Sequence, residues 1–394
     1  MDKAGRALGP ILAALLGVLA DGCHDSSAGR GAVTMAPSEP APRGSSARGV
    51  APAESSDPRA PAAPVAPDPV SVGEPAAAPT VTFLTVGDVM LSRNVAATIK
   101  DAGDPLLPFR PTAAMLASVD FVFGNLESPF SGGDHFVRSS DPTNSVLNAP
   151  KANIQGLSAH NFKILNLANN HVLDQGVGGL RYTLEQLKAR GIKTIGAGNT
   201  LDEAWAPEVV EAHGIRVGFV GASYTSVNDN GKSRNRYVAR MDDRARLGTA
   251  ITRSRAESDF VVVTMHAGRE YSPRPNRDQV EFAHAAIDLG ADIVFGAHPH
   301  VIQPLEVYRG KYIFYSLGNF IFDHETKPTK EGLTVKTSLR ARAPGHVRLS
   351  SLEILPVVIE NHSTPRPATR EEASSILSGA GIPEALIRPA EEKE

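Results

Sequence analysis

Five short apolar runs, each ending in polar residues, are the feature of this sequence that most constrains its fold. They read VTFLTVGD (81–88), DFVFGN (120–125), FKILNLAN (162–169), DFVVVTMH (259–266) and ADIVFGAH (291–298). Such runs, rich in β-branched and aromatic residues, are typical of buried strands that end in a loop. Helical patterns lie among them, at about 105–118, 151–160, 178–190, 242–257 and 276–289. Strands that alternate with helices of this length indicate an α/β domain.

Two pairs of strand-like segments, separated only by turn residues, modify that expectation. They are PEVVEAHG with IRVGFVGA (207–222) and QPLEVYR with KYIFYS (303–316). These pairs predict hairpins, so we expect a mixed rather than a purely parallel sheet. Two more strand-like stretches follow Glu331, and then a polar helix near 370–378. We therefore predict one globular domain over 81–360, followed by a C-terminal helix and charged tail over 361–394.

The first 22 residues have the pattern of an export signal. Lys3 and Arg6 are followed by a nearly unbroken apolar run over 7–20. This run is shorter than the roughly 20 residues that span a bilayer, but it suits a signal peptide. Cys23 follows in L-A-D-G-C, which resembles a bacterial lipobox with Asp21 as a departure from the usual pattern. We expect an exported lipoprotein anchored to the membrane of the cell envelope through Cys23; the alternative is an ordinary cleaved signal with a bystander cysteine.

The next segment, 24–80, has the composition of a linker. It contains eleven prolines and no Phe, Trp or Tyr. A chain of this kind cannot bury enough apolar surface to offset its ordering entropy, so we predict a disordered tether. The chain as a whole has 40 Lys and Arg against 43 Asp and Glu, a net charge of −3. It lacks the basic surplus of a nucleic-acid binder, and its single cysteine excludes a disulfide framework.

Polar side chains collect at the ends of the five predicted strands. In α/β sheets such ends meet at one edge, where ligands bind. Each residue alone has a simpler explanation, such as a helix cap at Asp88 or a hydrogen-bonded core histidine at His266. Five successive strands that all end in this way favour a common metal site. The residues are Asp88; Asn125 and Glu127; Asn169, Asn170 and His171; His266 and Glu270; and His298 and His300.

The chemistry of these donors narrows the choice of metal. Carboxylate, amide and imidazole groups together suit Mn, Fe or Zn better than Ca or Mg. A dinuclear site, with ions about 3.5–4 Å apart, needs a bridging carboxylate, and Glu127 is a candidate for it. We therefore predict a divalent metal site that is dinuclear.

Six ordered motifs within about 82–325 resemble the CapA family of capsule and poly-γ-glutamate biosynthesis proteins. They are GDVML, GNLESPF, NLANNHVLD, HAGREY, GAHPHVIQ and YSLGNFIFD. That family is similar to the calcineurin-like metallophosphoesterases, which implies a four-layer α/β/β/α sandwich with mixed sheets. The resemblance implies that His171 assists a leaving group and that Glu127 bridges two metals. The metal ligands it implies are Asp88, Glu127, Asn170, His266, His298 and His300.

The sequence departs from the phosphoesterase pattern at three places. Met90 stands where phosphoesterases have a histidine ligand, Glu127 replaces an aspartate, and no acidic residue directly follows His171. These changes predict that one of the two metals binds weakly or at a different spacing. We expect 315–323 to be largely an apolar strand whose Asn319 and Asp323 border the pocket. The candidates for substrate binding are Asn125, Arg269, Glu270 and Asn319, with Arg269 equally well a solvated surface residue.

Three interpretations of function follow from these features. The first is an envelope-tethered CapA-type protein that acts in the biosynthesis, export or anchoring of an anionic polymer such as poly-γ-glutamate. It would act with membrane polymer-synthesis subunits and carry a hydrolase-like metal site for phosphoester or amide linkages. The second is a polymer-binding accessory subunit without catalysis. The third is a general periplasmic metallophosphoesterase, against which Met90 counts.

Overall fold

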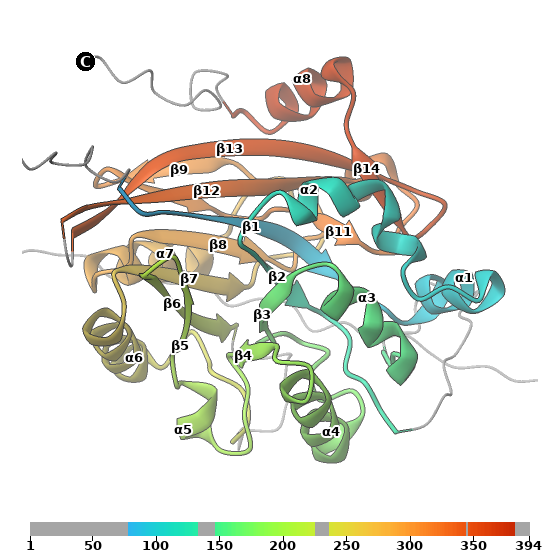
Figure 1. The fold of residues 1–394 in the computed structure, drawn as a ribbon, viewed down its shortest axis with the longest axis horizontal. Helices are drawn as coiled ribbons and strands as arrows, with labels where there is room; N and C mark the ends of the chain where they lie inside the picture. Colours follow the sequence, from blue (N-terminus) through green and yellow to red (C-terminus); the bar gives the residue numbers. More distant parts are fainter. Residues whose placement is uncertain (1–77, 133–145, 225–235, 344–345, 383–394) are drawn as a thin grey trace, which may run out of the picture. The chain divides into compact units, whose positions relative to one another are not determined.

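The apolar faces of the strands determine how the chain is layered. The structure, a computed structural model, describes residues 78–132, 146–224, 236–343 and 346–382. The predicted signal peptide 1–22, Cys23, the linker up to residue 77 and the tail from residue 383 lie outside the described residues. Two mixed sheets form the centre of the described part (Figure 1).

The first sheet has eight strands in the order β14-β13-β12-β1-β2-β3-β4, with β11 paired to β1. Strands β1 to β4 are mutually parallel, and β12 joins β1 antiparallel. The strands are β1 (Thr80–Val89), β2 (Phe121–Leu126), β3 (Phe162–Asn166), β4 (Lys193–Ile195), β11 (Asn319–Ile321), β12 (Glu331–Ala343), β13 (His346–Glu360) and β14 (Thr364–Pro367).

The second sheet has six strands in the order β5-β6-β7-β8-β10-β9. Its centre is parallel, and the two predicted hairpins form its edges, each an antiparallel pair. The strands are β5 (Glu208–Ala212), β6 (Ile215–Ser223), β7 (Phe260–His266), β8 (Ile293–Ala297), β9 (Leu305–Tyr308) and β10 (Lys311–Phe314).

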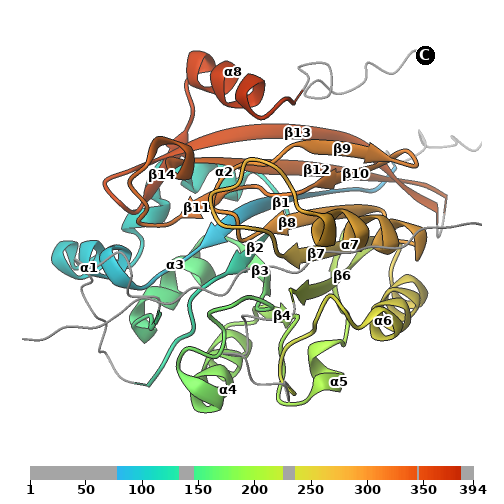
Figure 2. The same ribbon diagram turned by 180° about the vertical axis from the view of Figure 1, so that it is seen from behind.

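Three apolar cores separate the layers. Phe83, Phe121 and Phe123 of the first sheet pack against Phe219 of the second sheet, in a core that also contains Phe295. The other face of each sheet is covered by helices, as the view from behind also shows (Figure 2). The predicted four-layer α/β/β/α sandwich is therefore confirmed.

The helices on the first sheet are α1 (Arg93–Ala102), η1 (Leu107–Thr112), α2 (Ala113–Ala117), η2 (Lys151–Asn153), α3 (Ile154–Ala159) and α4 (Gly176–Lys188). The helices on the second sheet are α5 (Leu201–Ala204), α6 (Arg244–Glu257) and α7 (Arg277–Asp288).

The C-terminal part completes the first sheet. A short turn of helix, η3 (Lys327–Lys330), leads into β12, and α8 (Arg370–Gly379) follows β14. Ile376 and Leu377 of α8 are buried against the long strands. None of the described helices has both the length and the apolar character to cross a membrane.

Local structure differs from the sequence expectation at three places. The segment 105–118 is a 3-10 helix followed by a short α-helix, because Pro111 interrupts the hydrogen bonding of a continuous helix. Only Asn319–Ile321 of the segment 315–323 is a strand, since Gly318 turns the chain with φ 68°. Helix α1 was not expected, because its amphipathic pattern covers only 10 residues, which is a weak local signal; burial of Val95 and Ile99 stabilises it.

The ends of β1 and β11 approach too closely for a side chain at Gly87. A Cβ there would lie 2.1 Å from the carbonyl oxygen of Gly318, whose oxygen also accepts a hydrogen bond from the Asp88 N–H at 3.0 Å. We expect Gly87→Ala to lower the free energy of unfolding by at least ~2 kcal/mol, because backbone cannot move aside as a side chain can. Chemical denaturation of the full chain measures this.

Gly178→Ala is the matched control. Gly178 lies in the first turn of α4, and nothing lies within 4 Å of a Cβ built there. This variant should be neutral or more stable by up to ~1 kcal/mol. Equal stability of both variants would contradict the close approach at Gly87.

Candidate metal centre

A row of polar residues crosses the first sheet at the carboxyl ends of its parallel strands. Strand register places Asp88 beside Asn319 of β11 on one side and Asn125 of β2 on the other, and Asn125 beside Asn166 of β3. Their side chains are linked: Asn166 Nδ2 donates to Asn125 Oδ1 at 2.9 Å, and Asn125 Nδ2 donates to Asp88 Oδ1 at 2.8 Å. All four residues are buried. The sheet therefore presents a fixed carboxylate at this edge.

The second sheet supplies histidines to the same place. His266 ends β7, and its Nδ1 lies 3.1 Å from Asn125 Nδ2 across the space between the sheets. His298 and His300 follow β8, and the backbone N–H of His298 donates to Asp88 Oδ2 at 3.2 Å. His298 and His300 have φ values of 99° and 59°, a region that residues other than glycine rarely adopt. These unusual conformations turn both imidazoles toward the carboxylates.

Glu127 lies between two groups of possible ligands. Its Oε1 is 3.6 Å from His266 Nε2 and 3.7 Å from His300 Nε2. It belongs both to a group with His266 and His298 and to a group with Asp88 and His300. Separations of this size fit ligand atoms that share an ion about 2.0–2.2 Å from each of them.

The Glu127 carboxylate has no other partner. Both of its oxygens are buried and accept no hydrogen bond in the described part of the chain. Burial, the neighbouring Asp88 carboxylate and Glu270 raise the pKa of Glu127 well above its ordinary value. A buried carboxylate without a partner is strongly unfavourable, and a cation would remove that penalty. The residues present therefore fit a divalent metal.

The imidazoles of His266 and His298 are also prepared for a cation. Burial, followed by the neighbouring His298 and His300 charges, lowers the pKa of His266 well below its ordinary value. Burial also lowers the pKa of His298 to about 3. Both rings are thus neutral near pH 7, which is the form that binds a metal.

Asn170 and His171 enter this site from the loop after β3. Asn170 Oδ1 lies 2.8 Å from His266 Nε2, so it adds an amide oxygen to the group around His266. Asn169 shapes the loop: its Nδ2 donates to the carbonyl of Leu126 at 2.8 Å, and its Oδ1 accepts from the His171 N–H at 3.1 Å. Asn169 is therefore a positioning residue for its two successors.

His171 is oriented by a carboxylate. Its Nδ1 lies 2.7 Å from Asp174 Oδ2, and its Nε2 lies 3.9 Å from Glu127 Oε1. The acidic partner that does not directly follow His171 in the sequence is thus supplied three residues later. A carboxylate on Nδ1 fixes the ring so that Nε2 faces the site.

Met90 contributes no ligand. Its side chain is fully buried in the core between the first sheet and its helices, and its sulfur accepts a hydrogen bond from the Ser92 N–H at 3.1 Å. The first motif therefore delivers one described donor, Asp88, to the site. The group around Asp88 and His300 has fewer donors than the group that includes Asn170, His266 and His298.

The family follows from comparison with known sequences. The model of the bacterial capsule synthesis protein family PGA_cap matches residues 82–324. This chain belongs to the PGA_cap family. It is 31% identical to the PGA biosynthesis protein CapA of Bacillus subtilis over 287 residues, covering 73% of both chains. It is 32% identical to the capsule biosynthesis protein CapA of Bacillus anthracis over 297 residues, covering 73% of this chain and 70% of that one.

Solved structures resemble this PGA_cap protein more distantly. A phosphatase from Mycoplasma pneumoniae gives a TM-score of 0.44 with 12% identity, covering 77% of this chain and 99% of that one. A 5'-nucleotidase precursor from Thermus thermophilus also gives a TM-score of 0.44, with 14% identity, covering 78% of this chain and 60% of that one. A likeness at this level carries nothing about the activity of this chain.

The sequence-predicted site residues of this PGA_cap protein divide into three groups. The six predicted metal ligands come together, and His171 lies beside them. Among the predicted substrate-binding residues, Asn125 and Asn319 contact candidate ligands, with Asn319 Oδ1 at 2.9 Å from His300 Nδ1, and Glu270 lies within reach of His298 and His300. The exposed Arg269 makes no ion pair with any described residue.

Some residues of the site were missed in the sequence. Asn166 lies inside an apolar run, where a single polar residue was the available signal. Arg93 stands two residues after the first motif, and its guanidinium is paired with Asp323. His324 was also missed; its ring centroid lies 4.8 Å from that of His300.

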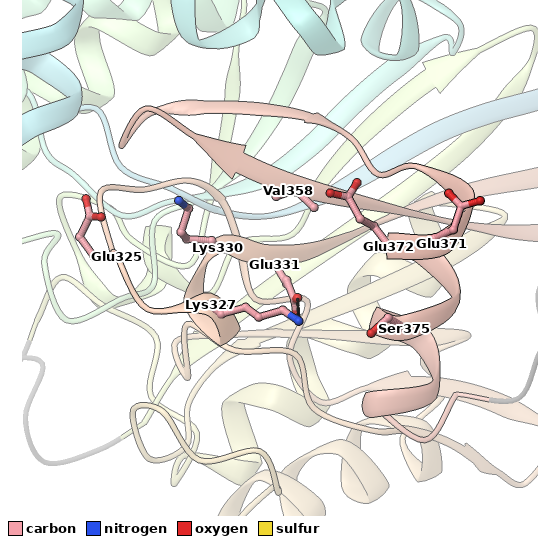
Figure 3. A pocket seen from close by; sticks show the side chains of 8 residues that line it. All are labelled: Glu325, Lys327, Lys330, Glu331, Val358, Glu371, Glu372 and Ser375. Atoms are coloured by element: carbon pink, nitrogen blue, oxygen red, sulfur yellow. Dashed lines mark ion pairs between the residues drawn. The ribbon is translucent and has the colours of Figure 1, made fainter.

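A separate groove lies between α8 and η3 (Figure 3). It has a volume of about 560 Å³, and Lys327 is paired with Glu331 on its wall at 3.8 Å. The segment that carries η3 also borders the metal centre, because Asn319 Nδ2 donates to the Thr329 carbonyl at 2.9 Å. The groove has no histidine and lacks the donor set of the candidate centre. Its lining residues are Glu325, Lys327, Lys330, Glu331, Val358, Glu371, Glu372 and Ser375.

Glu127→Gln should have opposite effects with and without metal. In chelator the variant should be more stable than the wild type at pH 7 by at least ~1 kcal/mol, because ionising Glu127 costs more in the folded chain than in the unfolded one. This gain should grow as the pH rises from about 4.5 toward the pKa of Glu127 in the folded chain, since only the unfolded wild-type residue ionises in that range. With Mn²⁺ or Zn²⁺ the wild type should gain more stability than the variant. Thermal and chemical unfolding measure both effects.

Glu185→Gln is the control, on the exposed face of α4. It should change stability little under either condition. A wild type whose stability does not respond to metal would contradict the metal assignment.

Proposed function

We propose that this chain acts in the biosynthesis, export or anchoring of an acidic capsule polymer such as poly-γ-glutamate, at the bacterial cell envelope. Its relatives are the PGA and capsule biosynthesis proteins CapA of two Bacillus species. The observation that carries the proposal is the position of Glu127 between two ligand groups in a chain of the PGA_cap family. A metal site of that form suits cleavage of a linkage in the polymer or in its precursor.

The proposed centre is dinuclear, with Mn, Fe or Zn as the metal. Asn170, His266 and His298 would hold one ion, Asp88 and His300 the other, and Glu127 would contact both. The second ion would bind more weakly, because Met90 is turned into the core. When bound, the ions supply Lewis acidity and positive charge at the linkage to be cleaved.

The chain's own residues add proton transfer. The Asp174 carboxylate keeps His171 Nε2 directed toward the Glu127 side of the site. From there the imidazolium form of His171, with its Nδ1–H directed at Asp174, would donate its Nε2 proton to the leaving oxygen or nitrogen of a phosphoester or amide linkage. Tyr224, whose ring centroid lies 4.9 Å from that of His298, stays protonated because burial raises its pKa to about 12. It would line the approach to the site as a neutral hydroxyl.

A polymer-binding accessory role without catalysis is the second candidate. The burial of Met90 favours it, because a centre with fewer ligands is less suited to hydrolysis than a complete dinuclear site. In that case the metal would bridge polymer carboxylates or stabilise the fold. The role of His171 separates the two candidates.

His171→Ala should keep its metal and its stability but lower turnover of the polymer linkage by about 10²–10⁴-fold. Asn170→Ala should lose metal and turnover together, because its oxygen is a proposed ligand. Metal analysis, a hydrolase assay with defined linkages and the amount of surface polymer in cells measure these effects. Full turnover and full polymer production by the His171 variant would instead favour the accessory role, and loss of metal would make His171 a ligand.

Lipid attachment at Cys23 is proposed as the membrane anchor. The wild-type protein should fractionate with membranes and partition into detergent, whereas Cys23→Ser should be soluble or remain unprocessed. Stable attachment needs more than one acyl chain, because a single chain binds only marginally. Mass spectrometry and fractionation test this; identical mass and fractionation of both forms would exclude the anchor.

A further inference from the structure

Arg93 has a strained backbone beside the candidate metal centre. Its φ is 45°, in the left-handed region, at the first residue of α1. Three other described residues with positive φ, Tyr271, His298 and His300, lie in or beside the centre. Such conformations cost about 1–3 kcal/mol each and persist where the surroundings enforce them, often at functional sites.

The side chain of Arg93 is held rigidly. Its guanidinium forms an ion pair with Asp323, and these side chains are only 12% and 4% exposed. Asp323 is itself fixed by the Asn94 N–H, which donates to Oδ2 at 3.2 Å. The guanidinium carbon lies 5.3 Å from the centre of the Phe322 ring, and that ring lies 4.5 Å from His300. Arg93 is thus fixed one ring away from a candidate ligand.

The ion pair leaves donors of Arg93 unused. Asp323 accepts from Nη2, while the buried Nε has no partner and Nη1 donates to no described residue. Arginine presents five donors in a planar fork that matches a carboxylate or a phosphoryl group. A second unpartnered buried nitrogen, Nδ1 of His324, lies on the other ring that contacts Phe322, at a centroid distance of 4.5 Å.

Arg93 lies beside the metal centre. The Phe322 ring lies between its guanidinium and His300, at 5.3 Å from the guanidinium carbon and 4.5 Å from the His300 ring, so a substrate of several atoms held at the centre would extend to Arg93. The exposed Tyr271, 5.6 Å from His324 between ring centroids, lies on the solvent side of this region.

We propose that Arg93, held by Asp323, binds a carboxylate of the substrate next to the linkage positioned at the metal centre. This inference rests on the proposed function, since it makes the site selective for an acidic polymer. Carboxylates and phosphoryl groups both present negatively charged oxygens to an arginine, so a phosphoryl group is the alternative ligand for Arg93. Arg93 is a binding and specificity residue here, with no part in proton transfer.

The test compares two synthetic oligomers on the metal-loaded full chain by calorimetry. One is γ-linked glutamate with free α-carboxylates, and the other carries amides in their place. The wild type should bind the acidic oligomer at least tenfold more tightly than the amide. Arg93→Gln should lose at least tenfold in affinity for the acid and little for the amide, and Arg93→Lys should lose less than Arg93→Gln, because it keeps the charge without the fork.

Two further variants show whether a loss of affinity comes from misfolding or from removal of any arginine. Arg93→Gln alone leaves the Asp323 carboxylate buried and unpaired, so the double variant with Asp323→Asn should recover the melting temperature but not the affinity for the acid. Arg277→Gln, on the exposed face of α7, should leave both affinities unchanged. Metal content should be the same in all variants.

The outcomes separate this inference from the proposed function. If polymer production in cells requires Glu127 but Arg93→Gln retains the preference for the acid, only the role of Arg93 is wrong. If the wild type does not bind the acidic oligomer but binds inorganic phosphate through Arg93, the carboxylate assignment is wrong and the proposed polymer function loses its support.

Discussion

Two carboxylates buried side by side, Asp88 and Glu127, are the constraint around which this protein is built. Asp88 is fully paired, by the amide of Asn125 and the backbone of His298. Neither oxygen of Glu127 accepts a hydrogen bond from a described residue. An ionised carboxylate without compensation in a protein interior costs several kcal/mol, so Glu127 favours its neutral form unless a cation lies beside it. The neighbouring imidazoles of His266, His298 and His300 are ligands that suit a divalent cation.

The two buried carboxylates lie together because of where the strands of the two sheets end. Parallel strands of two facing sheets bring their carboxyl ends to one place, and the row from Asn319 through Asp88 and Asn125 to Asn166 fixes one side of it. Close contact of Gly87 with Gly318 sets the position of Asp88 within that row. The opposite sheet then needs only three histidines to enclose the site. This geometry explains why residues far apart in the sequence act as one group.

Membership of the PGA_cap family gives the centre a biological setting without defining its reaction. The buried Met90 reduces the donors near Asp88, whereas the pair of His171 and Asp174 retains what a proton donor needs. The backbone of Arg93, His298 and His300 is strained, which lowers the stability of the fold but holds these side chains in their positions at or beside the centre. These features agree with a metal centre whose surrounding residues are held in defined positions.

The sequence by itself determined the α/β class and the row of polar strand ends, because strand and helix periodicity are local patterns. The four-layer arrangement and the six candidate ligands followed from the resemblance of its ordered motifs to the CapA family. The sequence did not reveal helix α1, whose amphipathic pattern is only 10 residues long, or the 3-10 turn imposed by Pro111. Only the tertiary structure decided that Asp174 orients His171, that Met90 turns into the core, and that Arg93 meets Asp323 across 230 residues of sequence. The physical reason is that Met90 and Arg93 take their positions from strand register and from packing between distant segments. The pairing of Asp174 with His171 depends on the path of the loop after β3, which the spacing of the two residues alone does not fix.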